Sequence, residues 1–437
     1  MPEAADKLSA RHVAIVVCCC LTCGIPIAML MNTAGLYYPI IAEEFDVPTA
    51  QISAWMAIHM VSAAVFSPVV GNIATRFHMR TLMLGGVLLA ATAFLVFSMA
   101  TAPWMFWAIA TITGFVMGAC MFVVPASLIN RWFAKHVGFL IGLYTAFTGI
   151  GAALFLLVGQ MILDTAGWRA AYLSYAVISL VVCVPAVLLC IRDTPEECGL
   201  RPYGYSEIAQ ADDPAVSDGL GDDADVRRYA SMCMRTPSFW LLLLAGFFAN
   251  VVCQAQAYFP KYIMWIDEQS VMGLAPAAFM AGAVVTSITH VGNGTGKLFL
   301  GAFSDFSVSK ATTALCVSGA AGLLCVWLLP STPLLGVGGL VYGFFLAAIP
   351  VIIPMLARAS FGSGRAYPII YAYVATAPFL GGATGNILLP MLADGPGGFD
   401  AMFAASVIML PIVLVAALIA LRLSPQSGHV EKRRPAR

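Results

Sequence analysis

Two apolar runs of the chain are joined by the stretch GNIATRFHMR (residues 71–80), and two more are joined by GAFSDFSVSK (residues 301–310). Each stretch begins with glycine and ends on a basic residue. The runs on either side are about 20 residues long, the length that a helix needs to cross a bilayer core of about 30 Å. The two stretches therefore indicate a helical membrane protein with a related loop in each half.

The composition of the chain is that of a membrane protein. Of 437 residues, 60% are hydrophobic and 10% are charged, whereas soluble domains carry about 25% charged residues. Basic and acidic residues balance at 22 each, which gives no reason to expect a nucleic-acid partner. The twelve cysteines lie in apolar segments or on the side assigned below to the cytoplasm. We therefore expect no disulfide bond and no metal site.

Twelve apolar segments are long enough to cross a bilayer, so we predict an all-α integral membrane fold. The first segment is too long for a signal peptide and is interpreted as a retained helix. A polar gap at 192–236 is interpreted as a mostly flexible cytoplasmic linker. The expected organisation is two six-helix halves, 1–191 and 237–423, followed by a basic tail, 424–437. The twelve segments lie near 13–38, 52–75, 81–100, 104–129, 138–160, 168–191, 237–259, 277–301, 311–330, 333–357, 368–392 and 401–423.

The distribution of basic residues predicts the orientation. With the N-terminus inside, 19 of the 22 basic residues fall in cytoplasmic pieces, and only Arg169 and Lys261 fall outside. The remaining one, Lys297, lies within the eighth segment. This asymmetry predicts a plasma-membrane protein with both termini in the cytoplasm.

Both quoted stretches resemble the loop pattern G-x-x-x-D-[RK]-x-G-[RK]-[RK] of the major facilitator superfamily. The first copy has Thr75 at the Asp position and His78 at the second Gly position, and the second copy keeps Asp305. Within that superfamily the chain resembles the monocarboxylate porters and the oxalate/formate antiporters. The matching pieces are 130–133, Gly138 and Gly142, 167–169, 195–204 and 235–240. The resemblance implies alternating-access transport of a small carboxylate, by proton symport or by exchange, without a cofactor.

The resemblance also implies a role for Lys297. A basic residue eight positions before the loop aspartate meets the substrate anion in these families, and Lys297 precedes Asp305 by eight. Proton-coupled porters often carry an acid four residues earlier, where this chain has Asn293. Oxalate exchangers carry a second cation in the eleventh helix, where this chain has Val374. A monocarboxylate is therefore favoured over a dicarboxylate, and exchange is slightly favoured over symport.

The acidic residues support an anionic substrate independently of the resemblance. All 22 fall in loops, in the linker or near the termini, so the helix interiors carry none. A pocket for organic cations would want a carboxylate there. A charged lysine in the bilayer needs an anion, water or loss of its proton to offset its cost. The alternative for Lys297 is a lysine whose long stem lets the ammonium reach the cytoplasmic interface.

Other polar residues complete a candidate binding set. His290, Asn293 and Lys297 follow one helix face at i, i+3 and i+7. His59 takes nearly the same place in the second segment as His290 takes in the eighth, and either could carry a proton or be a hydrogen-bonded core histidine. Asn32 and Tyr371 are further candidates, with bonds between helices as the alternative. The glycines interleaved with the stripe, Gly292, Gly294 and Gly296, could serve a site or close helix packing.

A cytoplasmic gate is predicted from charges at the inner ends of both halves. Its residues are Arg76, Arg80 and Arg131 in the first half and Asp305 in the second. Ion pairs among such groups could form and break during alternating access.

The sequence thus predicts a secondary transporter of a small organic anion that works as a monomer in the bilayer. Two alternatives stay open: a carrier of drug-like or neutral solutes, and a transporter-like membrane sensor. A membrane enzyme would need a nucleophile–base pair, a metal cluster or a cofactor motif, and the sequence offers none of these.

Overall fold

The computed structural model describes residues 8–204, 223–269, 275–329 and 332–425. These residues are almost entirely helical, with one isolated β-bridge between Phe133 and Tyr203. The chain divides into two compact units. Unit 1 is Met1–Met234 with Phe361–Thr376, and unit 2 is Arg235–Ser360 with Ala377–Arg437.

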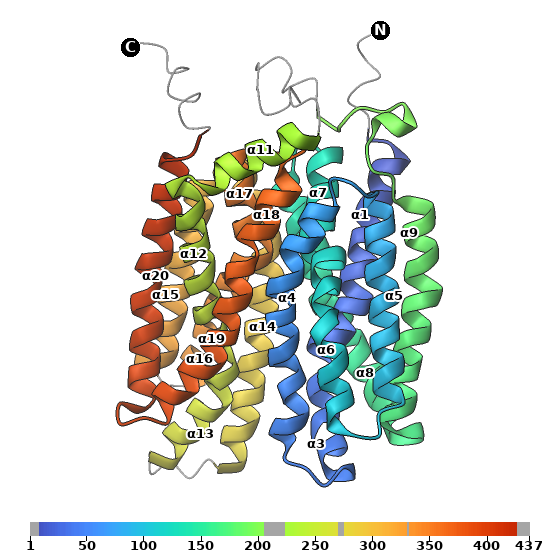
Figure 1. The fold of residues 1–437 in the computed structure, drawn as a ribbon. Coiled ribbons are helices and arrows are strands. Elements are labelled where there is room, and N and C mark those ends of the chain that lie inside the picture. The colour runs from blue at the N-terminus through green and yellow to red at the C-terminus, as the bar shows by residue number, and fades with distance from the viewer. Residues whose placement is uncertain (1–7, 205–222, 270–274, 330–331, 426–437) are drawn as a thin grey trace, which may run out of the picture. The chain divides into compact units, whose positions relative to one another are not determined.

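Unit 1 contains the first six predicted segments and one helix from the second half of the chain (Figure 1). Its elements are α1 (Ala10–Thr22), η1 (Cys23–Ile27), α2 (Ala28–Asn32), α3 (Ala34–Glu44), α4 (Thr49–Ile73), α5 (Met79–Ser98), α6 (Pro103–Met117), η2 (Gly118–Phe122), α7 (Val123–Trp132), α8 (Val137–Ile178), η3 (Ser179–Cys183), α9 (Val184–Cys190), η4 (Glu196–Cys198), α11 (Asp223–Met234) and α18 (Tyr367–Val374).

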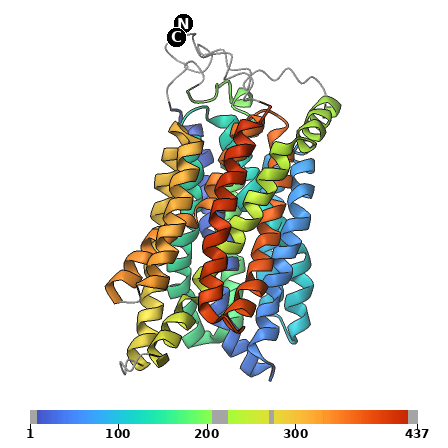
Figure 2. The ribbon, with the colours of Figure 1, turned by 90° about the vertical axis from the view of Figure 1, so that its left-hand side faces the viewer.

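In unit 2 the helix α15 packs against α14, α16 and α20, and the long helices run alongside one another (Figure 2). Its elements are α12 (Pro237–Cys253), η5 (Gln254–Tyr258), α13 (Phe259–Gln269), α14 (Ala275–Phe306), α15 (Val308–Leu328), α16 (Thr332–Phe345), η6 (Ala348–Ile352), α17 (Ile353–Phe361), α19 (Thr376–Ala393) and α20 (Gly398–Arg422).

The structure confirms the helical membrane fold. Among the described residues, nine helices are long and apolar enough to cross a membrane. The fifth and sixth predicted segments share one of them, Val137–Cys190, which is broken at Gly167. Gly167 has φ 80°, a conformation that only glycine adopts freely. The eleventh segment is split into α18 and α19, just before Pro378, which has no N–H to continue the helix.

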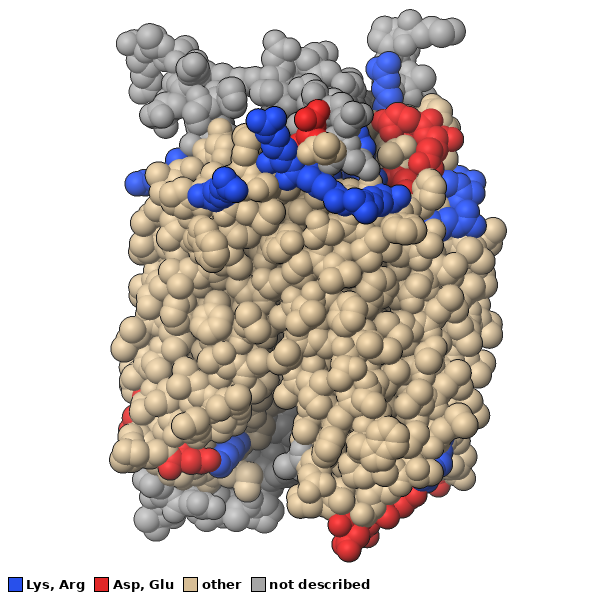
Figure 3. Space-filling model, in the orientation of Figure 1, with Lys and Arg blue, Asp and Glu red and all other residues tan. Residues whose placement is uncertain are grey.

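Charged side chains gather at the ends of the helices. On the face shown in Figure 3, lysines, arginines and acids occupy the two ends, and the belt between them is formed by other residues. The ion pair Arg169–Glu44 (2.5 Å) lies at such an end in unit 1, and Lys261–Asp394 (2.7 Å) lies at one in unit 2. An apolar belt between charged ends is what a bilayer requires of the surfaces that face it.

Four π-helical segments interrupt the long helices of the described chain, and each lies beside a proline. Pro26 is inside η1, Pro125 follows η2, Pro185 follows η3, and Pro350 is inside η6. A proline inside a helix removes one N–H donor and its ring collides with the carbonyl four residues earlier. Inserting one extra residue as a π turn is a common local solution.

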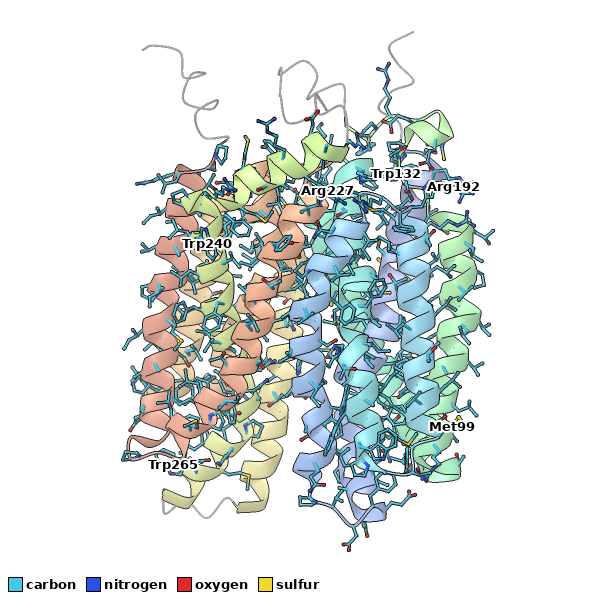
Figure 4. All side chains as sticks on the ribbon, in the orientation of Figure 1. Met99, Trp132, Arg192, Arg227, Trp240 and Trp265 are labelled. Carbon is cyan, nitrogen blue, oxygen red and sulfur yellow. The ribbon has the colours of Figure 1, made fainter. Side chains whose placement is uncertain are left out.

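The predicted linker is in part ordered, which differs from the expectation of a mostly flexible segment. Residues 192–204 are bound to unit 1: Tyr203 N–H donates to Trp132 O (2.9 Å), and Trp132 Nε1–H donates to Arg192 O (3.1 Å). Figure 4 shows Trp132 and Arg192 at the same end of this unit. Residues 223–234 form α11. Composition predicted flexibility because it does not register such long-range bonds. Most of the predicted basic tail lies outside the described residues.

Two hydrogen-bonded tyrosines lie in the core of unit 1, and Gly159 leaves space for their hydroxyl groups. Tyr37 O–H donates to Tyr175 Oη (2.8 Å), and Tyr175 O–H donates to Phe155 O (2.7 Å). A Cβ atom at position 159 would overlap both hydroxyl groups.

Gly159→Ala should therefore lower the free energy of unfolding by about 1–3 kcal/mol, the usual cost of overpacking a core. Thermal denaturation in detergent measures the effect. Gly85→Ala is the matched control, because the nearest atom to its Cβ would be Phe115 Cε1 at 3.8 Å. Equal melting temperatures for the two variants would contradict the packing argument.

Candidate functional site

The predicted stripe lies on α14 in unit 2. Lys297 is buried, with 5% of its surface exposed, and it is the basic residue that the sequence placed well inside the eighth predicted span. Asn293 is half-buried, and its Oδ1 is shielded from solvent without a hydrogen-bond partner among the described residues. His290 is exposed and lies within electrostatic reach of Lys297. The helix thus presents an ammonium, an amide and an imidazole along one face.

The glycines of α14 divide between two roles. A Cβ at Gly292 would overlap Leu340 O, and one at Gly296 would come within 2.7 Å of Phe344 Cα, so both glycines allow α16 to approach. A Cβ at Gly294 would meet nothing within 4 Å. Close helix packing therefore explains two of the three glycines. Asn293 and Lys297 each follow a packing glycine by one position, so each lies about 100° around the helix from this contact.

His59 differs from His290 in its surroundings. It is fully buried in unit 1, where its Nδ1 lies 2.8 Å from Thr113 Oγ1. The Thr113 hydroxyl donates to Ala110 O (3.1 Å), so the ring nitrogen is assigned as the donor to Thr113. The other nitrogen, Nε2, is buried and has no hydrogen-bond partner in the part of the chain that the structure describes. His59 thus joins α4 to α6, which is the core arrangement considered as the alternative.

Asn32 and Tyr371 also lie in unit 1. Asn32 is exposed, and its Nδ2 donates to Thr148 O (3.2 Å), which joins α2 to α8. Tyr371 is 1% exposed and stacks on Tyr367, with ring centroids 5.5 Å apart. The structure therefore places three of the six candidate binding residues together on α14, and the other three at separate places in unit 1.

Among the predicted gate residues, Arg80 is bound through its backbone by Asp193, which the sequence did not single out. Arg76 is exposed, Arg80 and Arg131 are half-buried in unit 1, and Asp305 is half-buried in unit 2. Within unit 1 the loop 71–80 is bound by Asp193. Asp193 Oδ2 lies 3.0 Å from His78 Nδ1, and its Oδ1 accepts from Arg80 N–H (3.4 Å).

The same loop begins where α4 touches α18. A Cβ at Gly71 would overlap Ala372 Cβ and would come within 2.6 Å of Pro368 O. Beside it, Asn72 Nδ2 donates to Tyr373 Oη (3.3 Å). Gly71 therefore heads the loop pattern because the backbone of α18 lies directly against it. A glycine at the start of a repeated loop was the only signal of this contact in the sequence.

Comparison with known proteins identifies the family to which this architecture belongs. The family model described as Major Facilitator Superfamily matches residues 20–306. The chain belongs to the Major Facilitator Superfamily. As a superfamily member with long apolar helices, it is an integral membrane transporter, and the predicted resemblance to monocarboxylate porters is confirmed.

Similar proteins and structures agree with this membership. Human monocarboxylate transporter 11 is 26% identical over 406 residues, which cover 86% of this chain and 76% of that protein. Mouse monocarboxylate transporter 12 is 23% identical over 338 residues, covering 74% and 67%. FucP in the outward conformation superposes with a TM-score of 0.67 at 15% identity, covering 94% of this chain and 99% of FucP. The human organic anion transporter MFSD10 gives 0.63 at 16%, covering 93% and 99%. At these identities the two structures show the fold alone.

Proposed function

We propose that this superfamily member transports a small monocarboxylate across the membrane by alternating access, as an anion exchanger. The observation that carries the proposal is Lys297, a cation 5% exposed on α14, with Asn293 and His290 on the same helix face. A carboxylate is the anionic group that such an ammonium and its hydrogen-bonding neighbours would bind. Relatives that are named monocarboxylate transporters support the same substrate class.

The position of Lys297 within a predicted membrane span supports an anionic substrate. A buried cation costs several kcal/mol on insertion scales unless an anion or water offsets the cost. A site that binds and releases an anion makes that offset part of the transport cycle. A pocket for drug-like cations would require an intramembrane carboxylate, and the sequence places every acid outside the helix interiors. Both termini are proposed to lie in the cytoplasm, on the side where the basic residues gather.

Uptake by purified protein in proteoliposomes tests the substrate class. A panel should contain labelled monocarboxylates, dicarboxylates, a neutral sugar and an organic cation. The proposal expects saturable uptake of at least one monocarboxylate and none of the cation. Uptake of only neutral or cationic solutes would favour the alternative carrier, and uptake of no solute by a folded protein would favour the membrane sensor.

The coupling mode has its own expected result. Since no acid lies in the helix interiors, a transported proton would have to be carried by His59, His290, Lys297 or the substrate. Exchange needs no such proton, so uptake should require internal substrate and should ignore an imposed pH gradient. The measurement compares preloaded with empty vesicles, each with and without an inward proton gradient. Accumulation in empty vesicles driven by the gradient alone would establish symport, and loss of that response in His290→Gln would assign the proton to the histidine.

A further inference from the structure

The helix that spans the membrane fourth changes its hydrogen-bond register just before Pro125. The π segment η2 separates α6 from α7, and Val123 N–H donates to Gly118 O, five residues earlier. Pro125 has no N–H. In α-helical register its partner would have been Met121 O, and in π register it would have been Cys120 O. In α-helical register the proline therefore removes the backbone donor of Met121 O.

A side chain from α8 takes the place of that donor, and two more side chains of unit 1 bind the carbonyl before it. Tyr144 of α8 donates its hydroxyl to Met121 O (3.0 Å), and Tyr144 is only 1% exposed. Cys120 O accepts from Thr22 Oγ1 (3.4 Å) and from Cys23 Sγ (3.3 Å), at the junction of α1 and η1. Of these bonds the one from tyrosine is the shortest.

The part of the helix beyond the break carries contacts made at the end of unit 1. α7 ends at Trp132, whose carbonyl and indole nitrogen both bind the 192–204 segment. α7 also packs against α18, the helix that lies against Gly71 of α4. A change in the angle between α6 and α7 would move all these contacts together.

We propose that Tyr144 is a positioning residue for transport: its hydroxyl replaces the missing N–H of Pro125 and so fixes the angle at which α7 leaves α6. Pro125 makes the junction between α6 and α7 flexible, and the bond from the Tyr144 hydroxyl holds it at one angle. A bond from a side chain can be made and broken without unwinding the helix, whereas a backbone bond cannot. The inference rests on transport as such, and it holds whether the substrate is a carboxylate or another solute.

The proposal predicts that the effect of removing the hydroxyl depends on the proline. Tyr144→Phe should raise amide exchange within residues 118–132 on the order of tenfold, the change expected for one hydrogen bond. Pro125→Ala restores a backbone donor for Met121 O, so Tyr144→Phe added to Pro125→Ala should change exchange there less than twofold. Hydrogen–deuterium exchange of the full-length protein in nanodiscs measures all four proteins without any substrate.

Transport assays then separate positioning from substrate binding. For the solute that the wild type takes up, Tyr144→Phe should change turnover by about tenfold and leave KM within about twofold, because the hydroxyl acts on α7. Pro125→Ala should also slow turnover, since it stiffens the junction. Amide hydrogen exchange can be measured without any substrate. A failed uptake panel would therefore leave this inference intact.

Tyr175→Phe is the matched control, because this buried tyrosine also donates from α8 to a backbone carbonyl, that of Phe155. Its removal should lower stability without raising exchange in 118–132, with or without Pro125. The proposal would be overturned if Tyr144→Phe raised amide exchange in 118–132 equally with Pro125 and with Pro125→Ala. A rise in amide exchange spread over the whole of unit 1 would overturn it too. A change in KM with unchanged exchange would overturn it as well and would move the hydroxyl to the substrate. If Tyr144→Phe fails to fold, adding Pro125→Ala should restore folding, and failure to fold in both backgrounds would overturn the proposal.

Discussion

Lys297→Gln should abolish substrate uptake while the protein stays folded. Glutamine keeps most of the length of the side chain and can donate hydrogen bonds, but it carries no charge to hold a carboxylate in a buried place. Hydrogen bonds to charged groups contribute about 1.5–3 kcal/mol, so kcat/KM should fall by at least about tenfold to a hundredfold. Initial rates of labelled monocarboxylate uptake into proteoliposomes measure the loss. Lys297→Arg keeps the charge and should retain part of the activity.

Lys261→Gln is the matched control for this change. Lys261 is an exposed lysine of the same unit that pairs with Asp394 at a helix end. Its replacement should leave uptake within about twofold, because exposed ion pairs contribute little. Size-exclusion profiles and melting temperatures establish that each variant is folded. Unchanged apparent affinity in Lys297→Gln would remove Lys297 as the anion anchor.

Gly71→Val is expected to separate α18 from α4 and to stop transport. Even a single Cβ at this position would overlap Ala372 Cβ and approach Pro368 O, and both lie on one helix that cannot yield locally. α18 must therefore move as a whole, which breaks the bond from Asn72 to Tyr373. Overpacking of this kind typically costs about 1–3 kcal/mol, enough to move a two-state equilibrium about tenfold to a hundredfold. A cysteine introduced at position 373 lacks this bond in every background, so its faster reaction with a thiol reagent when valine is present reports the separation of the helices.

The control places valine at another glycine of unit 1. Gly149→Val adds the same side chain where a Cβ would meet nothing within 4 Å, so labelling at position 373 and uptake should stay close to wild type. The native thiols interfere little, because most described cysteines are buried and only Cys190, Cys198 and Cys325 are half-exposed. Equal labelling rates in the two valine variants would show that α18 does not depend on the glycine contact.

The sequence predicted the helices well because each span is a local property. An apolar run of about 20 residues needs no partner to identify it. The breaks followed from glycine and proline: Gly167 and Pro378 each mark a place where one predicted segment gives way to the next piece of helix. The order within 192–204 was missed, because its bonds to Trp132 and His12 join residues far apart in the chain.

The candidate site was predicted unevenly for the same reason. The stripe on α14 follows from spacing within one helix, and the structure keeps its three residues together. His59 has nearly the same position in its repeat as His290, yet it binds Thr113 within the core of unit 1. The hydrogen-bond partner of a histidine side chain depends on the neighbouring helix. The sequence of its own segment does not reveal that partner. Asp193 was grouped with the acids of the linker, and only the fold brings it to His78.

The π segments have a consequence for anyone who compares this chain with a relative. Each one adds a residue to its helix without adding a full turn, so every side chain beyond it is rotated by about 100° relative to an uninterrupted helix. A helical wheel drawn through 103–132 as one piece would assign Asn130 and Arg131 to the wrong face. An alignment to a protein without the bulge needs a one-residue gap near 118–122, and without that gap it equates side chains that point in different directions. Residue correspondences beyond each bulge are therefore best taken from superposed backbones.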